Sequence, residues 1–274
     1  MKISITTPSF NQAKFIRQTL NSVLMNQDYD SLEYIVVDGL SNDSTFEILK
    51  EYKQKYFDKF NFIYEKDSGQ SNAINKGFQL VKGDIIGWIN SDDYYEDNIF
   101  QFIVNYFQEH PDVDMIYGKC NIVDENGQFI KRFEDSYGFK KCKIDPSRYD
   151  YNILLNVYSG LIPQQTVFFR RNIFDKVGYL DESYHFAMDY EYWLRIGRSC
   201  HIERVDKLLA NFRFHSEAKT NFRNNLGFIK ELVMARKHYS KKIFSVFTIF
   251  IIWILIKTYI KIALIDLGLI RSKA

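Results

Sequence analysis

The sequence of 274 residues is poor in proline and cysteine, with four prolines and three cysteines. Cys120, Cys142 and Cys200 are far apart and have no metal-ligand spacing, so they indicate neither a disulfide framework nor a zinc site. Free cysteines favour a reducing compartment. The formal charge of +2, with no dense basic block before residue 230, argues against a nucleic-acid partner. What remains is a globular protein with 46% hydrophobic residues.

Glycine-rich nucleotide motifs are also missing. Neither Gly-X-Gly-X-X-Gly nor Gly-X4-Gly-Lys-Ser/Thr occurs, which excludes the usual dinucleotide enzymes and P-loop ATPases. A Gly-X-Ser-X-Gly elbow and a His-Glu-X-X-His helix are absent as well. At the N-terminus, Ile3 and Ile5 alternate with polar residues and Pro8 interrupts the run, so no secretory signal is predicted. We therefore expect a cytoplasmic catalytic part.

Near the C-terminus, residues 243–256 form an uncharged run of fourteen residues, preceded by Lys241 and Lys242 and followed by Lys257 and Lys261. A membrane span needs ~20 residues, so this run is short for one. The length favours a helix lying on the inner face of the cell membrane, with its lysines at the lipid headgroups. A buried or oligomer-forming helix is the alternative.

The first hundred residues alternate between predicted strands and helices. We expect strands over residues 2–6, 34–37, 62–64 and 85–89. Tyr34 to Val37 is a continuous apolar run, as in a strand buried on both faces. Apolar residues at helical spacing predict the helices between them, such as Ile16, Leu20 and Val23. Ser44 and Glu47 predict a capping box at the start of the second helix. The alternation predicts an α/β fold, with a Rossmann-like, mostly parallel sheet flanked by helices.

After Asp114 the alternation ends. Asn126-Gly127, between two short apolar runs, predicts a β-hairpin with a type I′ turn. Further strands are expected over 165–170 and 208–214, and helices over 190–196 and 221–240. We therefore divide the chain into a domain over 1–220 and a basic helix with an apolar tail over 221–274. The domain has a nucleotide-binding half (1–117) and an acceptor half (118–220).

Polar residues follow the four predicted strands of the first half. They are Thr6-Thr7-Pro8-Ser9, Asp38, Glu65-Lys66-Asp67 and Asn90-Ser91-Asp92-Asp93. In an open parallel sheet, ligands bind beyond the carboxyl ends of the strands. A single acidic residue there is often a helix cap. Acidic residues at three of four ends along one edge instead indicate a ligand site.

The adjacent carboxylates of Asp92 and Asp93 would repel each other unless a cation compensates them. Mg²⁺ or Mn²⁺ takes oxygen ligands, commonly one or two carboxylates together with phosphate oxygens. A loop whose aspartates cap the following helix is the alternative. With no glycine-rich loop present, the sequence favours a nucleotide held by strand-end carboxylates and a metal ion.

Over residues 1–220 the chain resembles glycosyltransferase family 2, the inverting enzymes with the GT-A fold. The resemblance rests on several short segments in a fixed order, which are Thr6-Thr7-Pro8-Ser9-Phe10-Asn11, Val37-Asp38-Gly39, Asp67-Ser68-Gly69-Gln70-Ser71-Asn72-Ala73-Ile74-Asn75-Lys76-Gly77, Trp88-Ile89-Asn90-Ser91-Asp92-Asp93, Ala187-Met188-Asp189-Tyr190-Glu191 and Phe212-Arg213-Phe214-His215. The stretch from Gln164 to Glu182 resembles bacterial members that build surface polysaccharides.

This resemblance implies roles for individual residues. The implied donor-binding set is Thr6, Pro8, Phe10, Asp38, Asp67, Asn90, Ser91 and Asp93, with Asp38 and Asp67 at the nucleobase. Asp92 would bind the metal that bridges the two phosphates, His215 would reach the metal or the diphosphate, and Asp189 would be the base. Two departures stand out, because the family often has Asp where Asn90 stands and Glu where Met188 stands.

The function that the resemblance implies is transfer of a sugar from a nucleotide-diphosphate donor, expected to be a UDP-sugar, to an acceptor hydroxyl. The expected acceptor is a saccharide or lipid-linked saccharide in surface-polysaccharide biosynthesis. A sugar nucleotidyltransferase is one alternative, but it needs a glycine-rich basic loop where Pro8-Ser9-Phe10-Asn11-Gln12 stands. A non-catalytic membrane scaffold is another, and it gives no reason to keep Asp92, Asp93, Asp189 and His215 together.

Two acidic residues compete for the role of base. Asp189 and Glu191 are two residues apart on a predicted helix, so they point to nearly opposite sides. Glu191 lies one turn before Arg195 and is expected to pair with it. Asp189 flanks an apolar stripe, where partial desolvation would raise its pKa and make it the better base.

Overall fold

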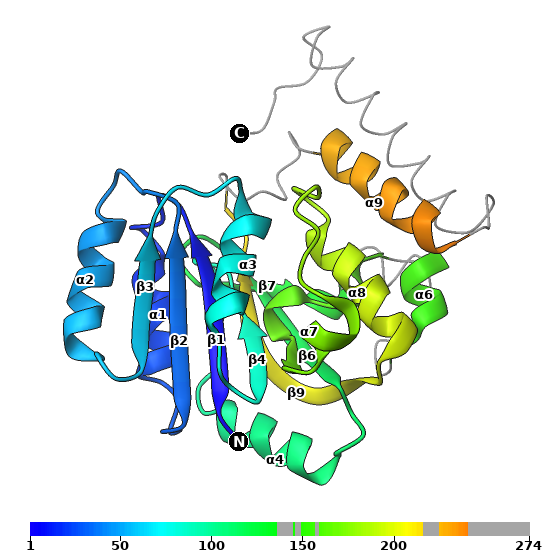
Figure 1. Cartoon of the computed structure of the whole chain (residues 1–274), viewed down its shortest axis with the longest axis horizontal. Coiled ribbons are helices and arrows are strands. Elements are labelled where there is room, and N and C mark those ends of the chain that lie inside the picture. Colours follow the sequence, from blue (N-terminus) through cyan, green and yellow to red (C-terminus); the bar gives the residue numbers. More distant parts are fainter. Residues whose placement is uncertain (136–144, 146–148, 157–158, 216–224, 241–274) are drawn as a thin grey trace, which may run out of the picture.

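The structure is a computed structural model of the chain, and it describes residues 1–135, 145, 149–156, 159–215 and 225–240. Its main elements, in chain order, are β1 (Ile3–Ser9), α1 (Ile16–Leu24), β2 (Leu32–Asp38), α2 (Thr45–Lys55), β3 (Phe60–Tyr64), α3 (Gln70–Leu80), β4 (Ile85–Trp88), β5 (Tyr94–Tyr95), α4 (Phe100–Glu109), β6 (Met115–Val123), β7 (Phe129–Arg132), α6 (Tyr151–Asn156), β8 (Phe168–Arg170), α7 (Ile173–Val177), α8 (Met188–Ser199), β9 (Ile202–Arg213) and α9 (Asn225–Tyr239). The strands form one sheet in the order β3-β2-β1-β4-β8-β6-β9-β5, with β7 paired to β6 (Figure 1).

The first four strands form the parallel half of this sheet. β1 pairs in parallel with both β2 and β4, and β2 pairs with β3. Alternate residues of β2 face opposite layers: Ile35 and Val37 pack with α3 and α8, whereas Tyr34 and Val36 pack with α1, α2 and α4. Burial on both faces explains the continuous apolar run of β2 from Tyr34 to Val37. The predicted α/β class is confirmed.

The prediction of a mostly parallel sheet is wrong, because the second half is mixed. β8 is antiparallel to its neighbours β4 and β6. β6 is parallel to β9, and the short β5 is antiparallel to β9. The long β9 curves along the sheet to reach both partners (Figure 1). Apolar periodicity identifies a strand but carries no information on its direction, which is why the second half was mispredicted.

The predicted capping box of α2 does not form. Ser44 makes no side-chain cap hydrogen bond. Instead Asp43 Oδ1 accepts the backbone N–H of Thr45 (2.9 Å), and Asp43 Oδ2 accepts that of Ala13 (3.0 Å). Asp43 therefore caps this helix and ties it to the loop after β1.

The β-hairpin predicted at Asn126-Gly127 is confirmed, since β6 and β7 pair antiparallel. Its turn type is not I′, which requires a positive φ at both central residues. Gly127 has a φ of +82°, but Asn126 is not among the described residues with positive φ. Gly127 N–H donates to the Asp124 carbonyl (3.0 Å), so the turn spans residues 124–127 and ends on the glycine.

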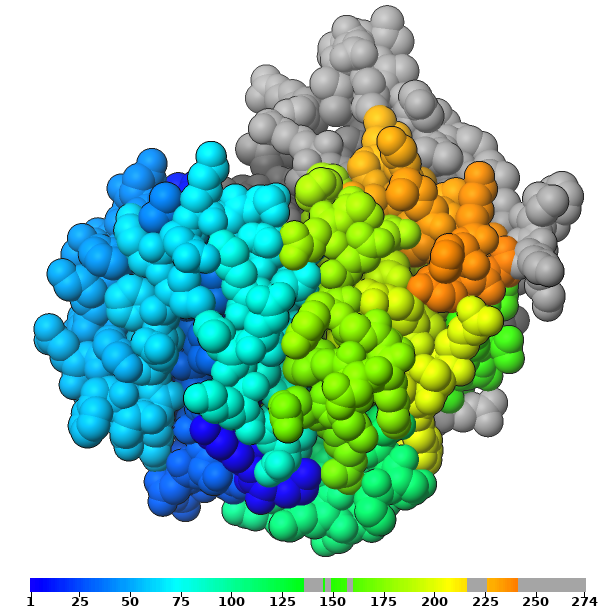
Figure 2. All heavy atoms as spheres, viewed as in Figure 1, coloured from blue at the N-terminus to red at the C-terminus, as the bar shows by residue number. Residues whose placement is uncertain are grey.

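Helix α9 packs against α8 through Ile229, Leu232 and Ala235, which belong to the same apolar core as Trp193. Figure 2 shows α9 (orange) on the surface beside the yellow-green segment around residue 185. Within the described ranges, none of the helices has the length and apolar character to cross a bilayer. The predicted apolar tail, 243–256, lies outside the described residues. The divisions at 117/118 and 220/221 stay predictions; β6 runs across the first.

Candidate active site

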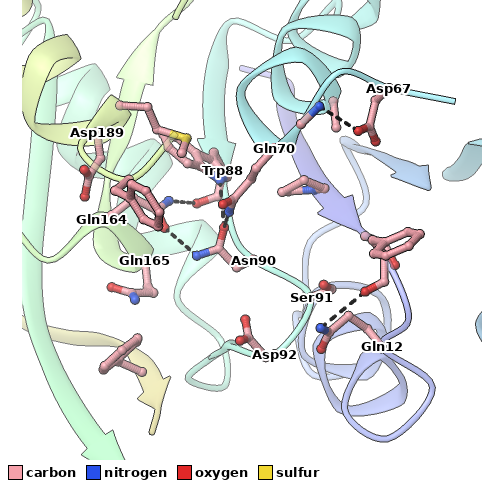
Figure 3. A pocket seen from close by; sticks show the side chains of 18 residues that line it. Gln12, Asp67, Gln70, Trp88, Asn90, Ser91, Asp92, Gln164, Gln165 and Asp189 are labelled. Atoms are coloured by element: carbon pink, nitrogen blue, oxygen red, sulfur yellow. Dashed lines mark hydrogen bonds between the residues drawn. The ribbon is translucent and has the colours of Figure 1, made fainter. Parts of the chain in front are cut away.

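A cavity of about 510 Å³ lies at the carboxyl ends of the parallel strands. Figure 3 shows Asp67, from the loop after β3, and Asp189, from the first turn of α8, on opposite sides of it, with Asp92 between them at another edge. Its lining residues are Pro8, Ser9, Phe10, Gln12, Asp67, Gly69, Gln70, Ala73, Trp88, Asn90, Ser91, Asp92, Gln164, Gln165, Phe186, Met188, Asp189 and Phe212. The predicted edge of the sheet is therefore where the cavity lies.

Most of the predicted site residues meet at this cavity. Those in its lining are Pro8, Phe10, Asp67, Asn90, Ser91, Asp92 and Asp189. Thr6, Asp38, Asp93 and His215 are buried beside it and do not line it.

Asp38 and Thr6 occupy supporting positions. Asp38 is fully buried, and its two oxygens accept the backbone N–H and the hydroxyl of Ser41 (2.8 and 2.7 Å). Both oxygens are thus engaged in the turn after β2. Thr6 is buried under α3, where its side chain fills the space left by Gly77. Donor contact by these two residues stays a prediction.

Asp67 depends on the absence of a side chain at Gly39. Asp67 Oδ1 accepts the backbone N–H of Gly69 (2.9 Å), which fixes the carboxylate at the cavity wall. A Cβ at Gly39 would lie 2.5 Å from Asp67 Oδ2. The φ of Gly39 is not in the left-handed region, so the constraint at this position is space and not backbone conformation.

Gly39→Ala should therefore displace Asp67 and weaken donor binding. We expect the donor KM to rise about tenfold, the effect of losing one charge-assisted hydrogen bond, with a smaller change in kcat. Titration of the donor in a transfer assay measures this. In the double variant Gly39→Ala/Asp67→Ala, the two effects should not add, because the alanine methyl no longer meets a carboxylate. Additive effects would mean that Gly39 acts elsewhere.

Asn90 is the centre of an amide network on one wall. Its Oδ1 accepts from Gln70 Nε2 (2.8 Å) and Trp88 Nε1 (3.2 Å). Its Nδ2 donates to Gln164 Oε1 (3.2 Å; Figure 3). The same Nδ2 lies 3.4 Å from Asp93 Oδ2. A carboxylate at position 90 could not donate and would repel Asp93. The network thus gives a physical reason for Asn90 where the family often has Asp.

Asp92 and His215 meet although they are far apart in sequence. His215 Nε2 lies 2.9 Å from Asp92 Oδ2, and the ring packs on Phe15. Asp93 turns inward, where its Oδ1 accepts the backbone N–H of Arg213 (2.9 Å). Burial, together with the charge of Asp92, raises the pKa of Asp93 well above its ordinary value. Asp92 is the member of the pair that lines the cavity.

These side chains fit a divalent cation only as a partial ligand set. Within the described ranges, no group of three His, Cys, Asp or Glu side chains could hold a metal by itself. A carboxylate oxygen of Asp92 and the imidazole of His215 could supply two ligands. Mg²⁺ usually keeps several waters and takes substrate phosphates beside one or two carboxylates, so the set is compatible with an ion that binds together with its nucleotide.

Asp189 has the properties of a general base. It lies in the first turn of α8, half-buried, and its Oδ1 accepts the backbone N–H of Tyr190 (2.8 Å). Burial raises the pKa of Asp189 to about 6, and the charge of Glu231 adds to the shift. The carboxylate is therefore ionised at neutral pH but is a stronger proton acceptor than an ordinary aspartate.

Glu191 has a structural environment, as predicted. It is 5% exposed and forms an ion pair with Arg195 (2.8 Å) on the next turn of α8. The Tyr239 hydroxyl of α9 also donates to Glu191 Oε1 (2.9 Å). These bonds direct Glu191 towards α9, so Asp189 and not Glu191 lines the cavity.

The sequence profile of "Glycosyl transferase family 2" matches residues 4–178. The chain belongs to this family. An "uncharacterized glycosyltransferase" of Rickettsia prowazekii is 28% identical over 240 residues, covering 84% of this chain and 72% of the relative. The chondroitin synthase of Escherichia coli is 24% identical over 215 residues, covering 78% of this chain and 29% of the synthase.

Solved structures of other glycosyltransferases share the fold. Staphylococcus aureus TarS 1–349 in complex with UDP-GlcNAc superposes with a TM-score of 0.62 at 20% identity, covering 86% of this chain and 66% of that one. The mannosyltransferase PcManGT of Pyrobaculum calidifontis, with GDP-Man and Mn²⁺, gives 0.64 at 17% identity, covering 88% and 65%. The fold is thus GT-A-like. The chain spans about a third (34%) of the length of its relatives in Rickettsia felis and Rickettsia conorii.

Several lining residues received no role in the sequence analysis. Gln70, Trp88, Gln164, Gln165, Met188 and Phe212 stand inside the segments that resemble family 2, so their position in those segments was the available signal. Gln12 and Phe186 stand outside them. These side chains are uncharged, so no charge pattern in the sequence marks them. Only the fold shows that they line the same cavity.

Proposed function

We propose that this chain is an inverting glycosyltransferase that transfers a sugar from a nucleotide-diphosphate sugar to an acceptor hydroxyl with the help of a divalent cation. The observation that carries the proposal is the charge of the cavity. Asp67, Asp92 and Asp189 line it, and none of its described lining residues is Lys or Arg. A diphosphate adds further negative charge, so its binding requires a cation.

Each carboxylate has a separate role in this proposal. Asp67 binds the nucleobase, with Pro8 and Phe10 beside it, and Asn90 and Ser91 contact the rest of the donor. Asp92 and His215 would hold Mg²⁺ or Mn²⁺, which stabilises the charge that develops on the leaving diphosphate. Asp93 supports this site from the interior.

Asp189 accepts the proton of the acceptor hydroxyl. As the new bond forms from the acceptor oxygen to the anomeric carbon, the bond from that carbon to the diphosphate oxygen breaks, and its electron pair leaves with the nucleoside diphosphate. One displacement inverts the anomeric centre, so a single catalytic carboxylate suffices, unlike the pair of a glycosidase.

The proposal extends to the chemical class of the donor and of the acceptor. The structures solved with UDP-GlcNAc and with GDP-Man support a nucleotide-diphosphate sugar as the donor. The second of them also holds Mn²⁺, which supports the use of a divalent cation. We infer a UDP-sugar as donor. The likeness to a chondroitin synthase supports a saccharide acceptor, here inferred to be a lipid-linked saccharide in polysaccharide biosynthesis.

A screen of sugar nucleotides tests the function. UDP- and GDP-sugars are added to the purified protein with and without Mn²⁺, and released nucleoside diphosphate and thermal stability are measured. The cognate donor at 100 times its dissociation constant should add ~2.7 kcal/mol to the free energy of unfolding, only with metal present. A sugar nucleotidyltransferase would instead release pyrophosphate from a nucleoside triphosphate. A scaffold would give neither turnover nor a donor-dependent shift.

We further propose that the lysine-flanked apolar segment holds the enzyme at the cytoplasmic face of the membrane, near its acceptor. The run of fourteen uncharged residues supports this. Deletion of residues 241–270 should abolish flotation with anionic liposomes while sugar-nucleotide binding persists. Flotation of the truncated protein would contradict the proposal.

A further inference from the structure

The side chain of Glu231, on α9, binds the backbone that leads into α8. Its Oε2 accepts the N–H groups of Phe186 (2.7 Å) and Ala187 (2.9 Å), and its Oε1 accepts that of His185 (3.0 Å). Glu231 is 8% exposed, so these are charge-assisted hydrogen bonds of a buried carboxylate, fully buried at Ala187 and partly buried at His185 and Phe186. Asp189 follows only two residues after Ala187, in the first turn of the helix.

The segment before α8 is held from a second side by α3. The Ser71 hydroxyl donates to the Tyr184 carbonyl (2.7 Å). Asn75 donates to the Leu180 carbonyl and accepts its N–H, each at 3.0 Å. Residues 180–187 are therefore fixed between α3 and α9. The Ser71 hydroxyl also lies 3.1 Å from Met188 Sδ, but Glu231 of α9 is the side chain that binds the backbone of residues 185–187. In Figure 1, α9 lies beside α8 at the end of the molecule where β1 to β4 end.

We propose that Glu231 is a positioning residue, which holds the start of α8 so that the Asp189 carboxylate stands at the cavity wall. The inference rests on the function proposed above, in which Asp189 is the base. Without Glu231, three N–H groups would lose their acceptor, the one of Ala187 in a buried position, and the first turn of α8 would shift to recover one. A displacement of about 1 Å at a reacting group can lower the rate 10²-fold.

Glu231 also acts on Asp189 through its charge. The carboxylate of Glu231 raises the pKa of Asp189, in the same direction as burial does. Asp67 and Asp92 lie across the cavity from Asp189, and α8 carries Glu191 paired with Arg195. The further charged or titratable groups on the adjoining elements are His185 before α8, Arg198 of α8, and Lys230, Arg236, Lys237 and His238 of α9, of which Arg236 bonds the Leu155 carbonyl. A change in the pKa of Asp189 therefore distinguishes loss of Glu231 from a general loss of stability.

The test compares Glu231→Gln with Glu191→Gln. Both changes replace a buried, hydrogen-bonded carboxylate; Glu231 binds the start of α8 from α9, whereas Glu191 belongs to α8 and faces Arg195 and Tyr239. For Glu231→Gln we expect kcat to fall about 10- to 100-fold, with the donor KM nearly unchanged. The acid limb of the kcat/KM profile should move to lower pH, because a negative charge that raises the pKa of the base is gone. Glu191→Gln should lower Tm and leave that limb in place.

A measurement that needs no turnover separates this inference from the proposed function. In protein labelled with ¹³C at the aspartate carboxyls, the Asp189 signal is assigned with Asp189→Asn and titrated. Its pKa should be lower in Glu231→Gln than in the wild type and unchanged in Glu191→Gln. Absence of transfer by the wild type would refute the function alone, whereas an unchanged Asp189 titration in Glu231→Gln would overturn the role of Glu231.

Glu231→Asp covers the case in which the glutamine variant does not fold. It keeps the charge but is one methylene shorter, so we expect a smaller loss of kcat with the acid limb near its wild-type position. Wild-type kcat in Glu231→Asp and in any folded Glu231→Gln protein would overturn the proposal. An equal loss of kcat in Glu191→Gln would overturn it as well.

Discussion

Replacing Asp189 with asparagine should lower the transfer rate about 10²–10⁴-fold and leave the donor dissociation constant nearly unchanged. Asparagine keeps the shape of the side chain and can still accept the Tyr190 N–H through its Oδ1. It cannot take the proton of the acceptor hydroxyl. Rates at saturating donor, together with donor binding measured by calorimetry, test this expectation. A tenfold or greater loss of donor affinity would instead assign Asp189 to binding.

The pH dependence of the wild-type enzyme follows from the same residue. Burial raises the pKa of Asp189 to about 6, and the base must be ionised to act. The rate should therefore rise with pH up to about 6 and level off above it. Asp189→Asn should lose this acid limb from its residual activity.

The free energy of unfolding should fall over the pH range in which the rate rises. The pKa of Asp189 is higher in the folded protein, about 6, than its ordinary value of 3.8, so the folded state binds the proton more tightly. The wild type therefore loses stability as pH rises from about 4 to about 6, and the loss stays constant above. Asp189→Asn lacks this loss, so its Tm should exceed that of the wild type at pH 7 and the difference should vanish near pH 4.

Removal of the Asp92 carboxylate should abolish metal-dependent donor binding. Asp92 is the cavity-lining acid that meets His215, and no described lining residue is Lys or Arg to replace a lost cation. Asp92→Ala should thus show the same weak donor binding with Mn²⁺ as with chelator. His215→Ala should weaken binding less, because imidazole is a poorer match for a hard cation.

Asp30→Ala provides the matched control for Asp92→Ala. Asp30 is an exposed carboxylate whose partner is Lys59, away from the cavity lining. Its loss should leave the metal dependence intact. Full wild-type activity in excess chelator would contradict a metal mechanism altogether.

The parallel half of the fold and its site edge could be predicted from the sequence. β2 and β4 are buried on both faces, so their residues form apolar runs that end at polar ones. Topology then places the ends of the parallel strands together. Asp67 and Asp92 were predicted from their place after strands, whereas Asp189 was predicted from a segment that resembles the family.

Other parts of the site depend on partners that the sequence does not place. Asp38 ends β2, at the same edge of the sheet as the loop that carries Asp92, yet Ser41 engages both oxygens of Asp38. Glu231 stands in a helix that was predicted only as basic, and its role appears when α9 packs on α8. The role of Glu231 arises from contacts between segments about 45 residues apart, which no local pattern encodes. The Asp38–Ser41 contact is local, but the sequence alone does not show that both carboxylate oxygens are engaged in it.

The contacts between the loop after β4 and the end of β9 have a consequence for folding. Asp93 binds the Arg213 backbone and Asp92 meets His215, contacts that span 120 and 123 residues. Loops of that length close late, because their entropy must be lost before the contacts form. On a ribosome, a nascent chain ending before β9 would carry the nucleotide-facing strands without the histidine. Acquisition of metal-dependent donor affinity would therefore be one of the last events of folding, and it would report that β9 has found its place in the sheet.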